Sequence, residues 1–530
     1  MRRLRTLAIA SGLYFVAALA AAPLCAGQSS SSTPATQDAA QQALQQRIER
    51  LASSLEAAQS QVDQLRKEVE DLRRDLSAAK AQRVANAESA TDSRNTSVKA
   101  PVDQEADTQQ NQVTALREDQ DVLAAEVKQH EQVKVESESK FPVRVTGLVL
   151  FNAFVNQGVV DEIDVPTSAL RRNAGVSHGS VGGSMRQTWL GLEGQGPVLG
   201  RLHTSARVSL DFFGGVGGGT TSGPARIVRL RTAGIRAETE SNVFEARYDE
   251  PLISPLSPAS LAAVAQPALA WSGNLWTWAP ELRFEHKTML GQNRTLNFEL
   301  GLRDPYMAGI QTYQEERTPS PAELGRLPAM ETRLSYGSAV DPGARLSSYA
   351  DPVTSGWRIG GGGYYAKQSY GSGILVHTWA ITTDWQVPIL RWLRLSGELY
   401  RGTGLGGLGG GAYRDVVQGT DRVTGVSRTF GLDSGGGWVQ LQAVATPRMQ
   451  WNAALGQDAG SGSQLRLLNL PTPSNALGFY ARNRAVSGNL MYRPWNSVVL
   501  SPEFRRIWSW PISGSANVAN VFTFSAGYQF

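Results

Sequence analysis

The sequence NVFTFSAGYQF occupies residues 520–530. Apolar side chains fall on every second position from Phe522 to Phe530, and Thr, Ser, Gly or Gln stands between them. Successive side chains of a β-strand point to opposite faces, so this rhythm predicts a strand with one apolar and one polar face. The predicted strand ends on an aromatic side chain.

The same two-residue rhythm recurs in every part of the chain after residue 141. Val143, Val149 and Phe151, for example, share one face of a predicted strand, and Arg144 and Asn152 lie on the other. Such strands joined in sequence predict an all-β transmembrane barrel of about 16 antiparallel strands over residues 141–530. They lie near residues 143–152, 185–193, 201–212, 226–237, 243–250, 280–288, 296–303, 328–337, 356–368, 374–387, 392–402, 437–446, 449–458, 482–493, 497–508 and 520–530.

The connections between these strands alternate between short and long. Membrane barrels pair short turns on one side with longer loops on the other, so the alternation supports the barrel. One connection, residues 338–355, is long where a short turn is expected, which leaves a count of eighteen strands open. The short connections include 194–200, 238–242, 289–294 and 388–391, and the long ones include 157–184, 305–327, 403–436 and 459–481.

The segment before the barrel has a helical period instead. From Leu44 to Ala79 apolar residues recur at alternating gaps of four and three, which predicts a coiled coil over residues 39–80. A solitary solvated helix would leave this apolar seam bare. Residues 81–140 are polar and predict a linker with one short helix.

The N-terminus has the layout of a secretory signal peptide. Arg2, Arg3 and Arg5 precede an apolar run, and small residues end at Ala26, so we expect residues 1–26 to be removed. Lipid attachment at Cys25 is the alternative. Cys25 is the only cysteine of the chain, which excludes a disulfide framework and a cysteine-ligated metal.

The composition excludes several other classes of protein. No later run of about 18 apolar residues predicts a membrane helix. The net charge of +4 is too small to decide a partner, and no nucleic-acid partner is expected. The five histidines lack metal-ligand spacing, and no nucleophile motif is present, so we expect no enzyme, cofactor or metal. The glycine-rich residues 404–409 match a dinucleotide-binding pattern, but no helix follows, and a flexible external loop is expected there.

Three stretches carry a resemblance to a known family. RQTWLGLE (186–193), SLDFFG (209–214) and RLRTA (229–233) resemble the early strands of DcaP-like porins, and the aromatic end of 520–530 resembles the closing strand of outer-membrane barrels. An ordinary sandwich edge strand would not require that aromatic end. The resemblance implies a coiled coil, a trimeric sixteen-stranded barrel and passage of small anions, including dicarboxylates. At residues 246–250 the chain reads ARYDE, which differs from the family pattern and leaves the solute open.

The polar faces of the predicted strands suggest how a channel would be lined. A basic ladder would favour and orient organic acids, because guanidinium groups bind carboxylates in bidentate fashion. Alternatively the arginines pair with acids of neighbouring strands and stiffen the wall, and both interpretations can hold together. The predicted pore-lining bases are Arg207, Arg229, Arg231, Arg247, Arg283 and Arg333, and the acids are Glu245, Glu281, Glu285, Glu299 and Glu331.

Residues 251–279 are the connection predicted to enter the lumen. We expect a short helix there, capped by Ser257 with Pro258 in its first turn, and no charged residue precedes Glu281. A surface loop that covers a trimer contact is the alternative.

These features together predict an outer-membrane diffusion porin for small hydrophilic solutes that favours anions or organic acids. The expected partners are outer-membrane lipid, two further copies in a homotrimer, and peptidoglycan through a coiled coil in the periplasm. The alternative is a structural tether whose coil links a plugged barrel to the cell wall. A third hypothesis, an adhesin resembling an autotransporter, would expose the coil at the cell surface.

Overall fold

The computed structural model describes residues 134–135, 142–173, 175, 178–214, 227–291, 293–305, 319–338, 356–371, 373–470 and 480–530. The predicted signal peptide, coiled coil and nearly all of the polar linker lie outside the described residues.

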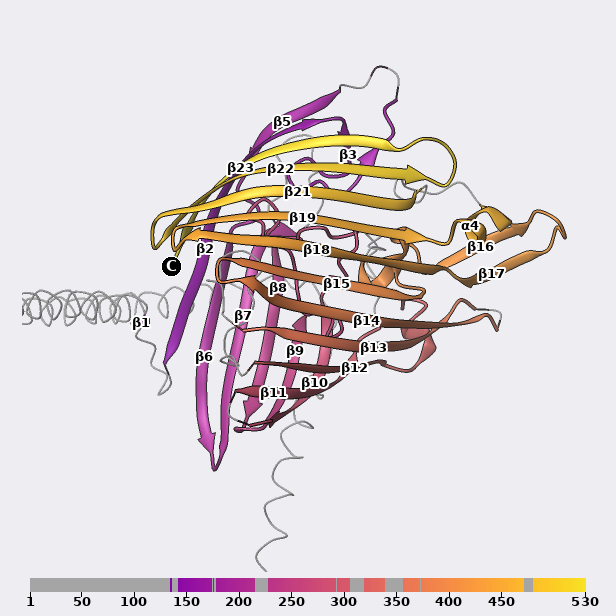
Figure 1. Cartoon of the computed structure of the whole chain (residues 1–530). Coiled ribbons are helices and arrows are strands. Elements are labelled where there is room, and N and C mark those ends of the chain that lie inside the picture. Colours follow the sequence, from indigo (N-terminus) through magenta and orange to yellow (C-terminus); the bar gives the residue numbers. More distant parts are fainter. Residues whose placement is uncertain are drawn as a thin grey trace, which may run out of the picture. The chain divides into compact units, whose positions relative to one another are not determined.

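One closed antiparallel β-barrel contains most of the described residues (Figure 1). Its strands fill sixteen positions, as the alternation predicts. They are β2 (Val143–Gln157), β6 (Trp189–Leu199), β7 (Leu202–Gly214), β8 (Ile227–Glu238), β9 (Asn242–Asp249), β10 (Ala279–Met289), β11 (Arg294–Arg303), β12 (Ala329–Ser338), β13 (Arg358–Ser369), β14 (Leu375–Leu390), β15 (Leu393–Thr403), β18 (Asp433–Thr446), β19 (Met449–Gly460), β21 (Tyr480–Trp495), β22 (Val498–Pro511) and β23 (Asn517–Gln529).

Two further segments join this sheet without adding a position. β5 (Gly179–Ser184) pairs with the second half of β2, and β6 pairs with its first half, so β5 and β6 together form one interrupted barrel strand. β1 (Lys134–Val135) pairs only with the start of β2.

The barrel closes between its first and last strands. β23 pairs with β2 from Asn520–Gln157 to Gln529–Leu148. The backbone N–H groups of Gly147 and Phe530 each donate to the other residue's carbonyl, at 2.9 and 3.1 Å. The prediction that residues 520–530 form the closing strand is confirmed.

The eighteen-strand alternative is wrong. β12 pairs directly with β13, from Met330–Tyr365 to Gly337–Arg358, so no further strand pair fits between them. The long connection after β12 remains an exception to the alternation. We call the end with the short turns (200–201, 239–241, 290–293, 391–392, 447–448 and 496–497) the turn end, and the opposite end the loop end.

The sequence analysis did not predict the small elements at the loop end. β16 (Val416–Asp421) pairs with β17 (Ser427–Gly431) and β20 (Leu468–Asn469), beside α4 (Gly462–Leu467). β3 (Val159–Val160) pairs with β4 (Ala169–Leu170). The single turns η1 (Glu323–Gly325), η2 (Gly406–Leu408) and η3 (Gly411–Tyr413) complete the described elements.

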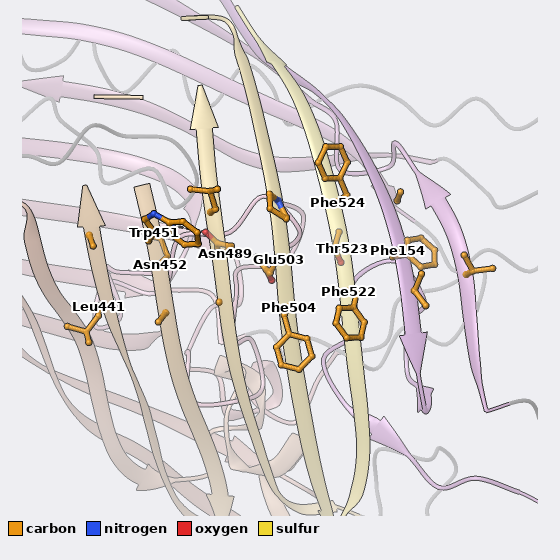
Figure 2. Close-up of a pocket in the computed structure, with 18 of the residues that line it drawn as sticks. Phe154, Leu441, Trp451, Asn452, Asn489, Glu503, Phe504, Phe522, Thr523 and Phe524 are labelled. Atoms are coloured by element: carbon orange, nitrogen blue, oxygen red, sulfur yellow. Dashed lines mark hydrogen bonds between the residues drawn. The ribbon is translucent and has the colours of Figure 1, made fainter. Parts of the chain in front are cut away.

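The outer face of the barrel is apolar. Along β2, Val149, Phe151 and Val155 are exposed, whereas the intervening Leu150 and Asn152 are buried on the inner side. An apolar groove of about 970 Å³ lies on the outer face, along β15, β18, β19, β21, β22, β23, β2 and β5 (Figure 2). We call this the outer groove; its wall includes Val155, Val181, Leu441, Trp451, Leu490, Phe504, Phe522 and Phe524. An apolar band of this kind suits a lipid surrounding.

Candidate functional site in the barrel interior

Residues 250–278, which join β9 to β10, fold into the barrel, and we call them the inner loop. Their large apolar side chains, including Ile253, Leu261, Val264 and Leu275, are buried. Leu261 and Val264 pack against Leu148 and other inner-face side chains of β2, β21 and β22. The predicted insertion into the lumen is confirmed, and the surface-loop alternative is wrong.

The inner loop contacts strands on almost every side of the lumen. Its backbone groups bond to side chains of the wall, in chain order, as it passes from one strand to the next. The bonds are Leu252 N–H to Glu331 (2.6 Å, β12), Thr382 Oγ1 to the Ile253 carbonyl (2.8 Å, β14), Leu256 N–H to Glu398 (2.8 Å, β15), Ala259 N–H to Gln440 (2.7 Å, β18), Asn489 Nδ2 to the Ala259 carbonyl (2.9 Å, β21), Val264 N–H to Gln187 (2.7 Å) and Arg229 Nη2 to the Ala265 carbonyl (2.8 Å, β8).

The predicted short helix in this loop is wrong. No helix occurs between β9 and β10, and the Ser257 hydroxyl accepts a bond from Asn274 Nδ2 at 3.0 Å instead of capping a helix. A buried backbone must satisfy its N–H and C=O groups, either within a helix or through other partners. Here the side chains of the wall supply those partners, so an extended course is available.

Sequence reasoning missed the wall residues that hold the loop. Glu398 accepts bonds from the Ser254 hydroxyl, from Leu256 N–H and, at 3.3 Å, from the Trp438 indole. Glu503 accepts the Ser260 hydroxyl at 2.5 Å. Their only signal in the sequence is an acid on the polar face of a strand, which the paired wall acids share.

Two other connections also enter the barrel. Residues 158–178 bond to β21 through Asn483 Nδ2 and the Thr167 carbonyl, at 2.8 Å. The start of the connection after β15 bonds to β19, because Gly411 N–H and Ala412 N–H donate to the Asp458 carboxylate. This corrects the external loop expected at residues 404–409, where Leu405 and Leu408 are buried beside the inner loop.

An aromatic stack joins the inner loop to the connection after β15. The rings of Trp271 and Tyr413 stack with centroids 4.4 Å apart. Both residues have positive φ, 60° and 67°, and so do Leu269 and Ala412. Residues other than glycine have a higher free energy at positive φ, so the surrounding packing must hold these four residues in place.

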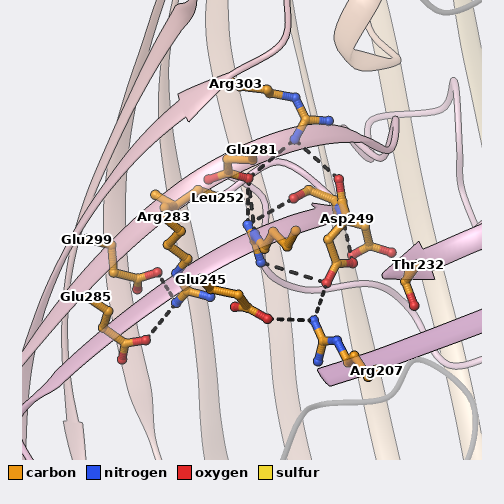
Figure 3. Close-up of polar contacts among 12 residues, drawn as sticks. Arg207, Thr232, Glu245, Asp249, Leu252, Glu281, Arg283, Glu285, Glu299 and Arg303 are labelled. Carbon is orange, nitrogen blue, oxygen red and sulfur yellow. Dashed lines mark hydrogen bonds and ion pairs between the residues drawn. The ribbon is translucent and has the colours of Figure 1, made fainter. Parts of the chain in front are cut away.

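Predicted ladder residues of β7, β9, β10 and β11 lie close together on the inner wall (Figure 3), and most of the arginines are paired. Arg207 bonds to Glu245 and Asp249, Arg247 to Glu281, and Arg283 to Glu285 and Glu299. Arg333 bridges Glu299 and Asp384 at 2.6 and 2.7 Å. The wall-stiffening interpretation therefore describes these arginines.

The predicted set also needs two corrections of partner. Glu331 is held by Leu252 N–H and lies 3.7 Å from Arg303, an arginine that the predicted ladder omits. Arg229 pairs in bidentate fashion with Asp211, at 3.0 and 2.6 Å, which the predicted acids omit. Arg303 and Asp211 lie on polar strand faces. The alternation therefore predicts on which face they lie, but not with which residues they pair.

For Arg207, Arg229 and Arg283 the arginine is the more exposed partner of its ion pairs. The exposed fractions of the side chains are 22% for Arg207 against 2% for Glu245, and 27% for Arg229 against 0% for Asp211. Arg283 is 16% exposed and Glu299 5%. The carboxylates lie against the wall and the guanidinium groups lie between them and the lumen. Arg333, at 2%, is buried and does not reach the lumen.

Arg229 and Arg231 also meet the end of the inner loop. Their guanidinium carbons lie 5.0 and 5.5 Å from the ring centroid of Trp278, which is a cation–π distance. Arg229 lies 5.4 Å from the Phe213 ring as well. Trp278, which the predicted site did not include, thus places the inner loop against the exposed arginines.

Glu250, at the start of the inner loop, has a perturbed acidity. Burial, and next to it the Asp249 carboxylate, raises the pKa of Glu250 to about 7. With a pKa of about 7, the charge of the Glu250 carboxyl group can change near neutral pH.

Among the described residues, no helix has the length and apolar character to cross a membrane. No group of His, Cys, Asp and Glu side chains there could hold a metal ion.

Comparisons with known proteins were made with the whole chain. No protein-family model matches it, and no curated protein matches its sequence. Among solved structures, the outer-membrane channel DcaP of Acinetobacter baumannii is similar, with a TM-score of 0.53 and 15% identity over 75% of this chain and 100% of that one. At that identity the similarity shows the fold, and the predicted resemblance to DcaP-like porins is confirmed for the fold.

Two further solved structures are similar at lower TM-scores. An anion-selective porin from Comamonas acidovorans has a TM-score of 0.42 and 12% identity over 74% of this chain and 100% of that one. OprB of Pseudomonas putida has a TM-score of 0.39 and 10% identity over 73% of this chain and 94% of that one. Both TM-scores are too low to support an argument.

Proposed function

We propose that the protein is an outer-membrane diffusion porin for small hydrophilic solutes, with a preference for anions and organic acids. The observation that carries the proposal is the exposure of Arg207, Arg229 and Arg283 in a closed barrel while their carboxylate partners lie against the wall. A pore lined in this way presents positive charge to water even though its ion pairs are nearly neutral in sum.

A comparison of solute uptake tests this proposal. Liposomes that contain the protein should swell faster in a dicarboxylate than in a diamine of similar size. Arg207→Gln should reduce that ratio by about two- to fivefold, since one exposed cation of the wall is lost while the acids beside it remain. Arg391→Gln is the matched control. Arg391 is exposed in the turn 391–392, outside the barrel strands, so the ratio should change little. A wild-type protein that admits the diamine faster would contradict the proposal.

The raised pKa of Glu250 predicts that the preference depends on pH. Below about pH 7 the carboxyl group is neutral and the lumen gains positive charge, so the anion preference should rise as pH falls from 8 to 6. Glu250→Gln should have, at both pH values, the anion preference that the wild type has at pH 6. An equal pH dependence in the wild type and in Glu250→Gln, measured by reversal potential, would assign the effect to another group.

We further propose how the protein lies in the envelope. The turn end faces the periplasm, residues 1–26 are removed as a signal peptide, and the predicted coiled coil of residues 39–80 lies in the periplasm. Two features support this arrangement. One end of the barrel has only short turns among the connections given above, with the exception of the connection after β12, and the apolar residues from Leu44 to Ala79 need partner helices to cover them. Three copies form the assembly, and the coil contacts peptidoglycan.

A structural tether is the second candidate, and one observation favours it. The inner loop and the two other connections bury inner-face side chains such as Glu398, Asn489 and Glu503. In a tether that packing would be a plug. Deletion of residues 28–140 separates the candidates. A porin without these residues should still take up solutes, whereas a tether should take up none before or after the deletion and should lose its attachment to the envelope.

A further inference from the structure

Three arginines lie on the outer face of the barrel, near the loop end of two neighbouring strands. On β21, Arg482 and Arg484 alternate with Asn483 and Ala485, which are buried on the inner side. On β22, Arg506 stands between the buried Arg505 and Ile507. We call Arg482, Arg484 and Arg506 the basic patch. Because the neighbours of these three arginines point inward, the basic patch faces outward.

No carboxylate of the described residues pairs with the basic patch, in contrast to the arginines of the inner wall. The Arg482 guanidinium lies 3.8 Å from the ring centroid of Trp510, and that of Arg506 lies 5.1 Å from Trp508. Arg484 donates two bonds to Gln457 Oε1, at 2.9 and 2.6 Å. Aromatic rings and one amide hold the three side chains, and their positive charge remains uncompensated.

Arg484 and Arg506 are placed to share one anion, and Arg482 lies on the same face two residues before Arg484. Arg484 lies opposite Trp508 and Val486 lies opposite Arg506, so Arg484 and Arg506 are diagonal neighbours on the same face. Diagonal neighbours on a sheet are within reach of long side chains. Guanidinium groups bind phosphate in bidentate fashion, and two or three around one phosphate form a strong site.

The basic patch adjoins the outer groove. Phe504, which lines the groove, precedes Arg506 by two residues on the same face, and its ring lies 5.0 Å from that of Phe522 (Figure 2). Apolar groove and basic patch therefore form one continuous amphipathic surface. Uncompensated arginines on the lipid-facing side of a barrel cost free energy unless an anionic group meets them.

We propose that this surface binds a phosphorylated, acylated glycolipid of the outer leaflet, the chemistry of lipid A. The phosphate contacts the basic patch and an acyl chain lies in the outer groove. The proposal rests on the orientation given above, in which the loop end faces the outside, where phosphate-bearing glycolipid is the leaflet's anionic lipid. Its charge complements the patch, and its acyl chains complement the groove.

Native mass spectrometry of the full chain in detergent tests the proposal, with purified lipid A and dephosphorylated lipid A as probes. The variant Arg482→Gln, Arg484→Gln, Arg506→Gln should bind lipid A at least about tenfold more weakly than the wild type, and the wild type should bind the dephosphorylated probe as weakly. The matched control is Arg201→Gln, Arg391→Gln, Arg448→Gln, which removes three exposed arginines at the turn end and should bind as the wild type does.

Three results would overturn the inference. They are wild-type affinity of the patch variant for lipid A, equal affinity of the wild type for both probes, and disulfide-linked dimers of the mature Arg506→Cys variant, which would show that a second copy covers the patch. Single-channel recording of the patch variant keeps the two proposals apart. Normal channels with unaltered lipid binding would refute only the lipid site, whereas a wild type without channels would refute the porin.

Discussion

Replacing residues 252–276 of the inner loop with a short glycine-serine linker is expected to raise single-channel conductance at least about threefold, because the loop crosses a lumen that sixteen strands would otherwise leave wide. Asp249 and Ala279 are paired neighbours on β9 and β10, so a short linker can join them. The wall groups that the loop now satisfies, such as Glu331 and Glu398, would be hydrated in the widened channel.

The control for this change is a shortening of residues 422–426, the turn between β16 and β17. That turn lies outside the barrel strands, and the conductance should stay within the wild-type range. Heat-modifiable mobility on gels shows whether each variant is folded. A folded inner-loop variant with wild-type conductance would mean that the loop does not limit the channel.

Arg333→Ala is expected to lower the free energy of unfolding by about 3–5 kcal/mol, the usual cost of breaking a buried ion pair by removing one partner. The Arg333 guanidinium is almost fully buried between Glu299 and Asp384. Its loss removes the ion-pair partner of Asp384 and leaves Glu299 with Arg283 alone. Urea unfolding in detergent measures the change. Arg236→Ala, which breaks a half-exposed pair with Glu238, should cost less than about 1 kcal/mol. A loss of under 1 kcal/mol in Arg333→Ala would show that water reaches this cluster.

The alternation of apolar and polar residues predicted the barrel because it identifies the two faces of each strand from that strand's own sequence. A strand such as β14, with Trp379 and Ile381 exposed and Thr378 and Thr382 buried, can be read without knowledge of its neighbours. The strand order followed as well, since consecutive strands of a barrel pair with each other. The β16–β17 hairpin was missed because its glycine-rich surroundings resemble a loop.

The interior could be predicted only in part. Insertion of the inner loop was expected from its place after the fifth strand, where general porins fold a loop into the lumen. Its course depends on partners far apart in the sequence, such as Ser260 and Glu503. Ser257 and Pro258 locally favour the start of a helix, but the tertiary hydrogen bonds of the loop outweigh this preference. Sequence placed Arg207 and Glu245 on polar faces, but which of them faces water depends on three-dimensional packing.

The reversal potential of the purified wild-type protein in a planar bilayer, across a tenfold gradient of potassium chloride, tests the central claim most directly. If the exposed guanidinium groups of the wall set the selectivity, chloride carries more of the current and the reversal potential has the sign of an anion-preferring channel. A potential of the opposite sign, or the absence of stable channels, would contradict the account.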